Sequence, residues 1–283
     1  MIHVKRTFLS ILALVSFFNS VLATAAIETK LPSGINQIIR RHKLVVVMPS
    51  EDSKPFFMTN AQGATFGLDA MIAKNIADRF GVELVIDRTA KSYDDAVKKV
   101  AAGMADLAIC HLTVSLEREM SVAFSTPYIQ SKHLLLLNRK ATIQYHLSET
   151  EYSDELAGKK ISLGVKSGSF FATQVRKDFP FAKISFFNTD DELYTSVESG
   201  AVSAVLTDEV SIQNWQSEHP RFAFYVKKLY RKNRSGHIAI AVNWGSNPLL
   251  QWVNLYLETI RNDGTLEKWI HGFLVEQVWK KSQ

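Results

Sequence analysis

The chain has 283 residues, of which 46% are hydrophobic and 22% charged, with 13 Gly, 7 Pro and 1 Cys. This balance excludes an intrinsically disordered protein, a collagen-like repeat and a small disulfide-stapled scaffold. The formal net charge of +5 is small for this length, and basic and acidic side chains are interleaved along the chain. We therefore expect no nucleic-acid partner.

Residues 1–25 are predicted to be a secretory signal peptide. Lys5 and Arg6 precede an apolar run at 8–18, and small residues follow up to Ala25, which is the order typical of a leader with an A-x-A cleavage site. The run is shorter than the roughly 20 residues of a membrane-spanning helix, so an N-terminal anchor is the weaker alternative. No Cys lies at the cleavage site. We expect a soluble periplasmic protein without a lipid anchor.

Short apolar strands and amphipathic helices alternate in the first part of the mature chain. Ile72 and Ile76 repeat along one helix that we expect to end at Gly81, and Ser92 is the expected N-cap of a second helix that ends near Gly103. The strands are expected at 44–48, 84–86 and 106–109. Such an order predicts an α/β unit with a parallel sheet.

A similar unit follows about a hundred residues later. Thr189 and Glu192 form a capping-box pattern that starts a helix, and Gly200 is its expected end. The strands are expected at 161–165, 184–187 and 204–206. Two such units favour two α/β lobes, and one larger doubly wound sheet remains the alternative.

Two further apolar strands, at 133–140 and 236–243, bracket the second unit. If both are crossovers, the chain leaves the first lobe, builds the second and returns, ending in helices up to Trp279. We expect the basic run from Lys227 to Arg234 to be a solvated loop. The predicted organisation is a signal peptide at 1–25, lobe 1 at 26–138, lobe 2 at 139–235 and the return to lobe 1 at 236–283.

The sequence contains none of the common enzyme motifs that we looked for. The sequence lacks HExxH, GxSxG and a Walker loop, and its 8 His show no metal-ligand spacing. We therefore expect no cofactor and no metal. Cys110 and His111 are adjacent on a predicted strand end, where their side chains point apart, so a buried structural thiol is expected rather than a nucleophile.

Polar residues follow the carboxyl ends of the predicted strands, which is where α/β folds bind ligands. Arg118 offers a guanidinium suited to a carboxylate, and Asp208 offers a carboxylate suited to an ammonium. Ser169 opens a helix whose N–H groups can face an anion. Taken alone, Arg118 also fits a surface cation and Asp208 a helix N-cap.

These segments resemble the family 3 periplasmic solute-binding proteins, the amino-acid receptors of ABC importers, over essentially the whole mature chain. The resemblance rests on four blocks, Gly67-Leu68-Asp69, Gly103-Met104-Ala105-Asp106-Leu107-Ala108, Thr113-Val114-Ser115-Leu116-Glu117-Arg118 and Phe124-Ser125-Thr126-Pro127-Tyr128. It implies a periplasmic-binding-protein-like α/β fold, in which two lobes are joined by two crossover strands with a cleft between them.

The resemblance also implies roles for single residues. Arg118, with Thr113 and neighbouring backbone, would hold the ligand's α-carboxylate, assisted by Ser169. Asp208 would hold its α-ammonium, and Tyr93 would be a pocket aromatic. The full set of expected ligand-binding residues is Arg118, Asp208, Thr113, Ser169, Tyr93, His111, Phe170 and Leu112.

The chain departs from the family pattern at several of these positions. His111 replaces the usual Ser or Gly, and Phe170 stands where many members carry a hydroxyl residue. Ser53 lies where an aromatic is usual. Glu51 or Asp52, close by, would favour a cationic side chain, with a solvated loop as the preferred alternative.

We expect a monomeric binding protein, not an enzyme, that captures a small zwitterion such as an amino acid by lobe closure. It would then deliver the ligand to an inner-membrane ABC permease. The alternatives are a cyclohexadienyl-dehydratase-like enzyme on the same fold, with Glu209 or His111 as general acid, and a ligand sensor. The sensor is the weaker of these, because no further domain follows Trp279.

Overall fold

The computed structural model describes residues 32–144 and 156–282. The predicted signal peptide lies outside these residues. No helix within them is long and apolar enough to cross a membrane.

The first five-stranded sheet has the order β4-β1-β5-β12-β6. β1 pairs in parallel with β4 and β5, whereas β12 is antiparallel to β5 and β6. The strands are β1 (Lys43–Pro49), β4 (Glu83–Ala90), β5 (Leu107–Ala108), β6 (Ala123–Phe124) and β12 (Ala241–Val242). A separate two-stranded sheet pairs β2 (Met58–Thr59) with β3 (Thr65–Phe66).

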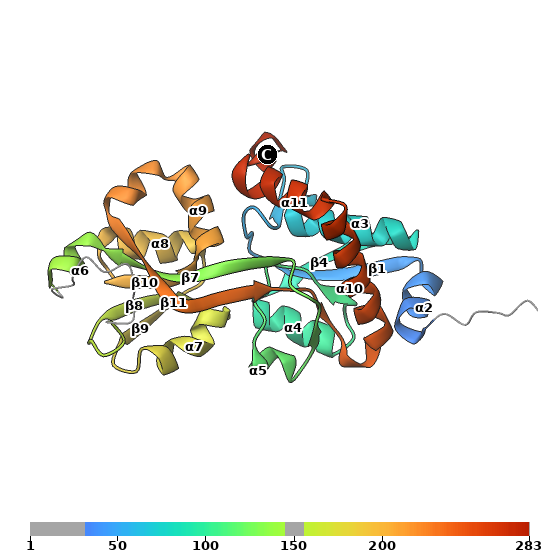
Figure 1. Cartoon of the computed structure of the whole chain (residues 1–283), viewed down its shortest axis with the longest axis horizontal. Coiled ribbons are helices and arrows are strands. Elements are labelled where there is room, and N and C mark those ends of the chain that lie inside the picture. The colour runs from blue at the N-terminus through green and yellow to red at the C-terminus, as the bar shows by residue number, and fades with distance from the viewer. Residues whose placement is uncertain (1–31, 145–155, 283) are drawn as a thin grey trace, which may run out of the picture. The chain divides into compact units, whose positions relative to one another are not determined.

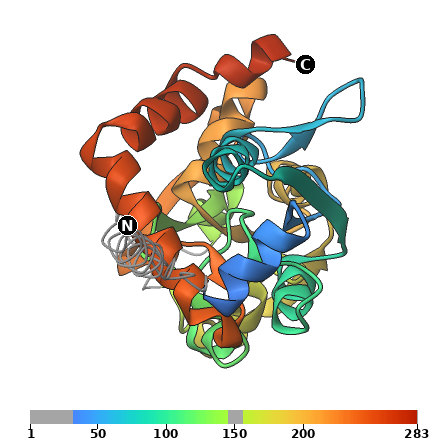
Figure 2. The same ribbon diagram turned by 90° about the vertical axis from the view of Figure 1, so that its right-hand side faces the viewer.

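Two of the helices that pack around this sheet, α3 and α4, have the ends that the sequence predicts. α3 ends at Gly81, which is left-handed with φ 66°, and the Ser92 hydroxyl at the start of α4 accepts a hydrogen bond from Asp95 N. The α-helices are α2 (Ser33–Arg40), α3 (Leu68–Phe80), α4 (Tyr93–Ala101), α5 (Leu116–Glu119), α10 (Asn247–Asn262) and α11 (Thr265–Ile270). Shorter turns are η3 (Trp244–Ser246), η4 (His271–Val275) and η5 (Val278–Ser282). Figure 2 shows α2, in blue, beside α10.

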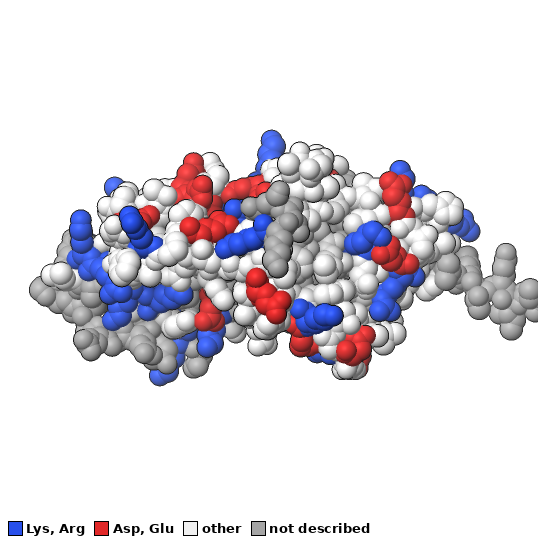
Figure 3. Space-filling model, turned by 90° about the horizontal axis from the view of Figure 1, so that it is seen from above, with Lys and Arg blue, Asp and Glu red and all other residues white. Residues whose placement is uncertain are grey.

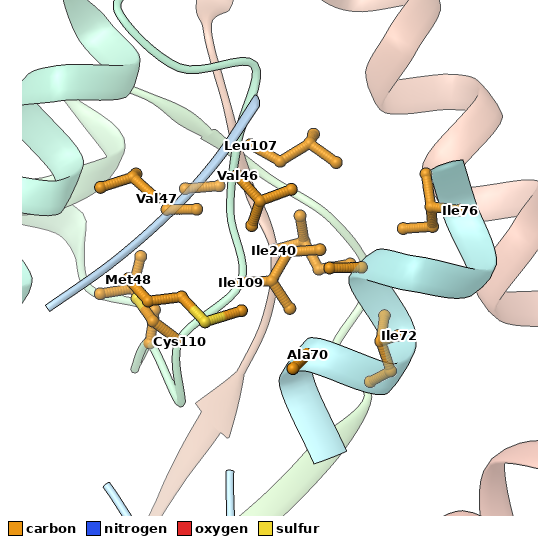
Figure 4. Close-up of a cluster of buried hydrophobic side chains, with 14 of the residues drawn as sticks. Val46, Val47, Met48, Ala70, Ile72, Ile76, Leu107, Ile109, Cys110 and Ile240 are labelled. Atoms are coloured by element: carbon orange, nitrogen blue, oxygen red, sulfur yellow. The ribbon is translucent and has the colours of Figure 1, made fainter. Parts of the chain in front are cut away.

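The core of the first lobe forms between β1 and α3 (Figure 4). Val46 and Met48 of the strand and Ile72 and Ile76 of the helix are fully buried, together with Leu107 of β5. The run of apolar residues in β1 is the pattern of a strand that helices cover on both faces. Because Ile72 and Ile76 are four residues apart, they lie on the same face of α3, the face that packs in this core.

The second five-stranded sheet has the order β11-β7-β10-β8-β9. Its strands are β7 (Ile129–Asn138), β8 (Ser162–Lys166), β9 (Lys183–Phe187), β10 (Ala204–Asp208) and β11 (Val226–Ile238). Leu135 and Leu137 of β7 pack into one hydrophobic cluster, and Leu134 and Leu136 into another, so both faces of the sheet are covered. The helices are α6 (Arg139–Gln144), α7 (Phe170–Asp178), α8 (Asp190–Ser199), α9 (Glu209–Glu218) and η2 (Pro220–Phe224).

The crossover strands β7 and β11 lie side by side as an antiparallel pair (Figure 1). The strand predicted at 133–140 ends earlier, because Arg139 and Lys140 begin α6. The strand predicted at 236–243 is divided, since β11 of the second sheet ends at Ile238 and β12 of the first sheet starts at Ala241. The two-lobe prediction is confirmed, and the alternative of one larger doubly wound sheet is wrong. The residue boundaries of the lobes stay a prediction.

The basic run from Lys227 to Arg234 is not the solvated loop that its charge suggested. It lies within β11, where Leu229 is buried. The Arg231 guanidinium, also inside the lobe, lies 2.5 Å from the Asp178 carboxylate of α7. Because Lys227, Lys228 and Lys232 around Leu229 are half-buried or exposed, the charges of this run conceal the strand in the sequence. On the face drawn in Figure 3, acidic and basic side chains lie next to each other in the middle and on the right, and basic side chains gather at the left.

Candidate functional site

A pocket of about 50 Å³ is lined by residues of both lobes. It brings together most of the residues expected at a ligand site, namely Arg118, Asp208, Thr113, Ser169, Tyr93, His111 and Phe170. Leu112 is not among its lining residues, because its side chain is fully buried in the core of the first lobe. Residues that follow strand ends therefore meet at one place, as the α/β topology predicts.

Arg118 lies in the short helix α5 and is 7% exposed. Its Nε and Nη2 donate to Asp94 Oδ1 over 3.0 and 2.9 Å, and its Nη1 donates to the Thr113 carbonyl over 2.8 Å. The Ser115 hydroxyl caps the helix by accepting from Arg118 N. A guanidinium carries five N–H groups, so this fixed Arg118 retains donors for a second carboxylate.

Asp208 ends β10 and is the N-cap of α9. Its Oδ1 accepts hydrogen bonds from Ser131 Oγ, Val210 N and Ser211 N over 2.8, 3.0 and 3.1 Å, and its Oδ2 accepts one from Ser211 Oγ over 2.8 Å. Burial acts to raise the pKa of Asp208, but the nearby His111 ring and the hydrogen bonds from Ser211 and Ser131 outweigh it and lower the pKa. A charged carboxylate is thus held at the pocket.

His111 has a positive φ of 52°. Its imidazole stacks on Phe56, with ring centroids 3.8 Å apart and planes 10° apart. Its Nε2 lies 4.0 Å from Asp208 Oδ1, which is beyond hydrogen-bond distance. Burial lowers the pKa of His111, which keeps the ring neutral near pH 7.

Lys166 is a pocket residue that sequence reasoning missed. Its Nζ lies 3.1 Å from Glu51 Oε1 of the first lobe and 3.2 Å from Asp190 Oδ1. Burial acts to lower the pKa of Lys166, but Tyr93, Asp190 and Glu51 together raise it well above its usual value. The signal was available, since Lys166 directly follows a predicted strand, yet its partners lie far away in the sequence.

The remaining predicted residues have partners of their own. Ser169 caps α7, accepting from Ala172 N, and donates to the Lys166 carbonyl over 2.7 Å. The Tyr93 hydroxyl lies 3.4 Å from Ser53 Oγ. The Phe170 ring lies 5.3 Å from the His133 ring, centroid to centroid. Aromatic and hydroxyl groups therefore surround the charged pair of Arg118 and Asp208.

A second hollow of about 310 Å³ adjoins the pocket and shares four lining residues with it, Ser53, Asp190, Tyr194 and Ser211. Glu51 and Asp52 both line this hollow. Neither is an unpaired anion, because Glu51 binds Lys166 and Asp52 binds Arg88 over 2.8 Å. The expectation that these carboxylates favour a cationic ligand side chain stays untested.

Known proteins resemble this chain in sequence and in fold. The L-cystine-binding protein of Escherichia coli (strain K12) is 24% identical over 241 residues, covering 83% of this chain and 85% of that protein. The cyclohexadienyl dehydratase of Pseudomonas aeruginosa is 22% identical over 203 residues, covering 71% of this chain and 72% of the enzyme. The crystal structure of an ancestral amino-acid-binding protein, a precursor of cyclohexadienyl dehydratase, superposes with a TM-score of 0.72 and 25% identity, covering 86% of this chain and 99% of that one.

A family model also matches most of the chain, from residue 45 to residue 276. The matched range includes all of the two five-stranded sheets except the first two residues of β1, together with the pocket residues. It confirms the resemblance inferred from the sequence blocks around Asp69 and Arg118. The chain belongs to the bacterial extracellular solute-binding proteins, family 3.

Proposed function

We propose that this protein binds an amino acid in the pocket between its lobes and delivers it to an ABC permease. The observation that carries the proposal is the placement of Arg118 and Asp208. They are buried charges of opposite sign that line one small pocket from opposite lobes. A zwitterion needs one fixed cation and one fixed anion. The name of the L-cystine-binding relative supports the same class of ligand.

The proposal includes how the protein works as a whole. It acts as a monomer in the periplasm, exported by the predicted signal peptide at 1–25, and it binds without catalysis. Glu209, one candidate general acid, does not line the pocket and accepts a hydrogen bond from the Tyr230 hydroxyl over 2.9 Å. His111, the other, is held neutral by burial, so it carries no proton to donate as an imidazolium.

The test is a melting experiment on the protein lacking residues 1–25, against a panel of amino acids and related organic acids. A ligand present at 100 times its dissociation constant stabilises the folded state by about 2.7 kcal/mol, which is visible as a raised Tm. Arg118→Ala should abolish the shift while circular dichroism shows an intact fold. Arg40→Ala is the matched control, because Arg40 is exposed and contacts Asn36.

Two outcomes would contradict the proposal. If no zwitterion raises the Tm of the wild-type protein, amino-acid binding is wrong. If prephenate or arogenate is turned over by the purified protein, the enzymatic alternative replaces it.

A further inference from the structure

The imidazole of His111 has a buried nitrogen without a partner. Its Nε2 has no hydrogen-bond partner within residues 32–144 and 156–282, although the side chain is only 6% exposed. A buried polar atom of this kind is costly unless something pairs with it. The nitrogen belongs to a residue that lines the ligand pocket.

The backbone and the ring of His111 are each held by one contact. His111 N donates to Asp69 Oδ2 over 2.6 Å, and the ring lies flat against Phe56. Nε2 is thereby placed beside Asp208, 4.0 Å from Oδ1. These contacts fix the nitrogen at a set distance from the carboxylate.

The distance between Nε2 and the carboxylate fits one shared ammonium group. Two N–H bonds of an ammonium diverge at the tetrahedral angle, so acceptors about 4 to 5 Å apart can each lie about 2.9 Å from its nitrogen. Asp208 Oδ1, the oxygen 4.0 Å from Nε2, already accepts three hydrogen bonds, whereas the neighbouring Oδ2 accepts one, from Ser211 Oγ. Oδ2 of the same carboxylate is therefore the acceptor left for the ammonium.

We propose that neutral His111 uses Nε2 as the second acceptor for the ammonium group of the ligand, alongside Asp208. The inference rests on the proposed function and adds a specificity-determining residue to it. A solute that lacks the ammonium leaves Nε2 unpaired and is rejected. A proton on Nε2 occupies the same position between ring and carboxylate, so proton and ligand compete.

Several charged or titratable groups face His111 or lie against it. They are Asp208, Asp190, Lys166, Arg118 and Asp69. Burial lowers the pKa of His133, which lies near Asp208, to about 4. Burial raises the pKa of Asp69 to about 7, so Asp69 is a second group that titrates and needs a control.

The experiment measures the dissociation constant of the best amino acid from the melting panel by calorimetry, from pH 7.5 down to below the pKa that NMR gives for His111 in the free protein. Wild-type affinity should fall in acid, approaching tenfold for each pH unit below the pKa of His111 in the free protein. His111→Asn should remove this fall. Asn suits the position because it tolerates a positive φ, and its amide does not titrate.

Two controls separate His111 from its neighbours. His111→Asn retains Asp69 and Glu51, so any pH dependence left in that variant belongs to them. His237→Gln removes another histidine, which contacts Gln130 over 3.2 Å outside the pocket, and should leave the pH profile unchanged.

NMR titration of the imidazole gives a second readout that a purely structural role would not move. The resonance absent from His111→Asn identifies the residue, and ligand should lower its pKa by at least about one unit, as proton–ligand competition requires. An unchanged or raised pKa on binding overturns the proposal. So does a pH profile shared by wild type and His111→Asn. Failure of every amino acid to bind at pH 7.5 would instead reject the proposed function.

Discussion

The carboxylate of Asp69 is fully buried beneath the ligand pocket and is held by two donors. Tyr128 Oη donates to Oδ1 over 2.8 Å, and His111 N donates to Oδ2. Burial raises the pKa of Asp69 to about 7, against the opposing effect of both hydrogen bonds. The folded state thus binds this proton more tightly than the unfolded state, and the contribution to stability falls as pH rises from about 4 through 7.

Tyr128→Phe should therefore destabilise the protein by about 1–3 kcal/mol at pH 8, because an ionised buried carboxylate loses one of its two donors. At pH 5, where Asp69 is protonated, the loss should be smaller. Urea unfolding at both pH values measures the difference. Tyr225→Phe, at an exposed position, is the control and should cost little. An equal loss at both pH values would show that Asp69 does not titrate as described.

At the residue scale, the sequence predicted which residues lie at the pocket better than which residues they contact. Arg118 and Asp208 are found from their places after strand ends and from the family blocks. The contact of Glu51 with Lys166 joins residues 115 positions apart, and the stacking of Phe56 on His111 needs a folded loop. Such contacts follow from tertiary structure and leave no local pattern.

A turn of the second lobe meets a helix start of the first lobe at Gly168. This glycine has φ 62°, between β8 and α7, and a Cβ added there would lie 2.5 Å from Cβ of Ser92, the N-cap of α4. Real Cβ atoms do not approach so closely. The two elements can come together as they do because residue 168 has no side chain.

Gly168→Ala should weaken ligand affinity, since the added methyl pushes the turn away from α4 and disfavours the closed pocket. Gly63→Ala is the matched control, because Gly63 also has a positive φ, 79°, but nothing lies within 4 Å of its added Cβ. Both variants should lose about 1 kcal/mol of stability through the left-handed backbone. Calorimetric titration compares their affinities. Equal affinities would show that the contact at Ser92 plays no part in binding.

At the element scale, helix ends were predictable and long strands were not. The Thr189 capping box and the left-handed Gly200 confirm the predicted limits of α8, because capping is a local interaction. β11 depends on pairing with β7, a segment about a hundred residues earlier, and its charged residues mask its apolar positions. The prediction of a loop at 227–234 failed for this reason, whereas the strands predicted at 133–140 and 236–243 were found with different limits.

At the scale of the whole molecule, the chain passes between the two sheets twice within the described residues. One connection leads from β6 to β7 and the other from β11 to β12. They are hydrogen-bonded to each other, since Ser125 N donates to the Ile240 carbonyl and Tyr128 N to the Ile238 carbonyl, both over 2.9 Å. We expect two paired connections of this kind to act as a single hinge.

Ligand should therefore lower the radius of gyration measured by small-angle X-ray scattering, because binding at groups from both lobes favours the closed state. Arg118→Ala, which lacks one of those groups, should show no change with the same solute. A radius that is equal with and without ligand, under conditions where calorimetry shows saturation, would contradict hinge closure.

Cys110, which belongs with Met48 to the buried core cluster of the first lobe (Figure 4), is the single thiol of the chain. It is fully buried, and burial with the nearby Asp69 raises its pKa far above the usual value. Thiol–disulfide exchange requires a thiolate that can reach its target. In the folded protein we therefore expect this thiol not to exchange with disulfides, and two copies not to crosslink through it.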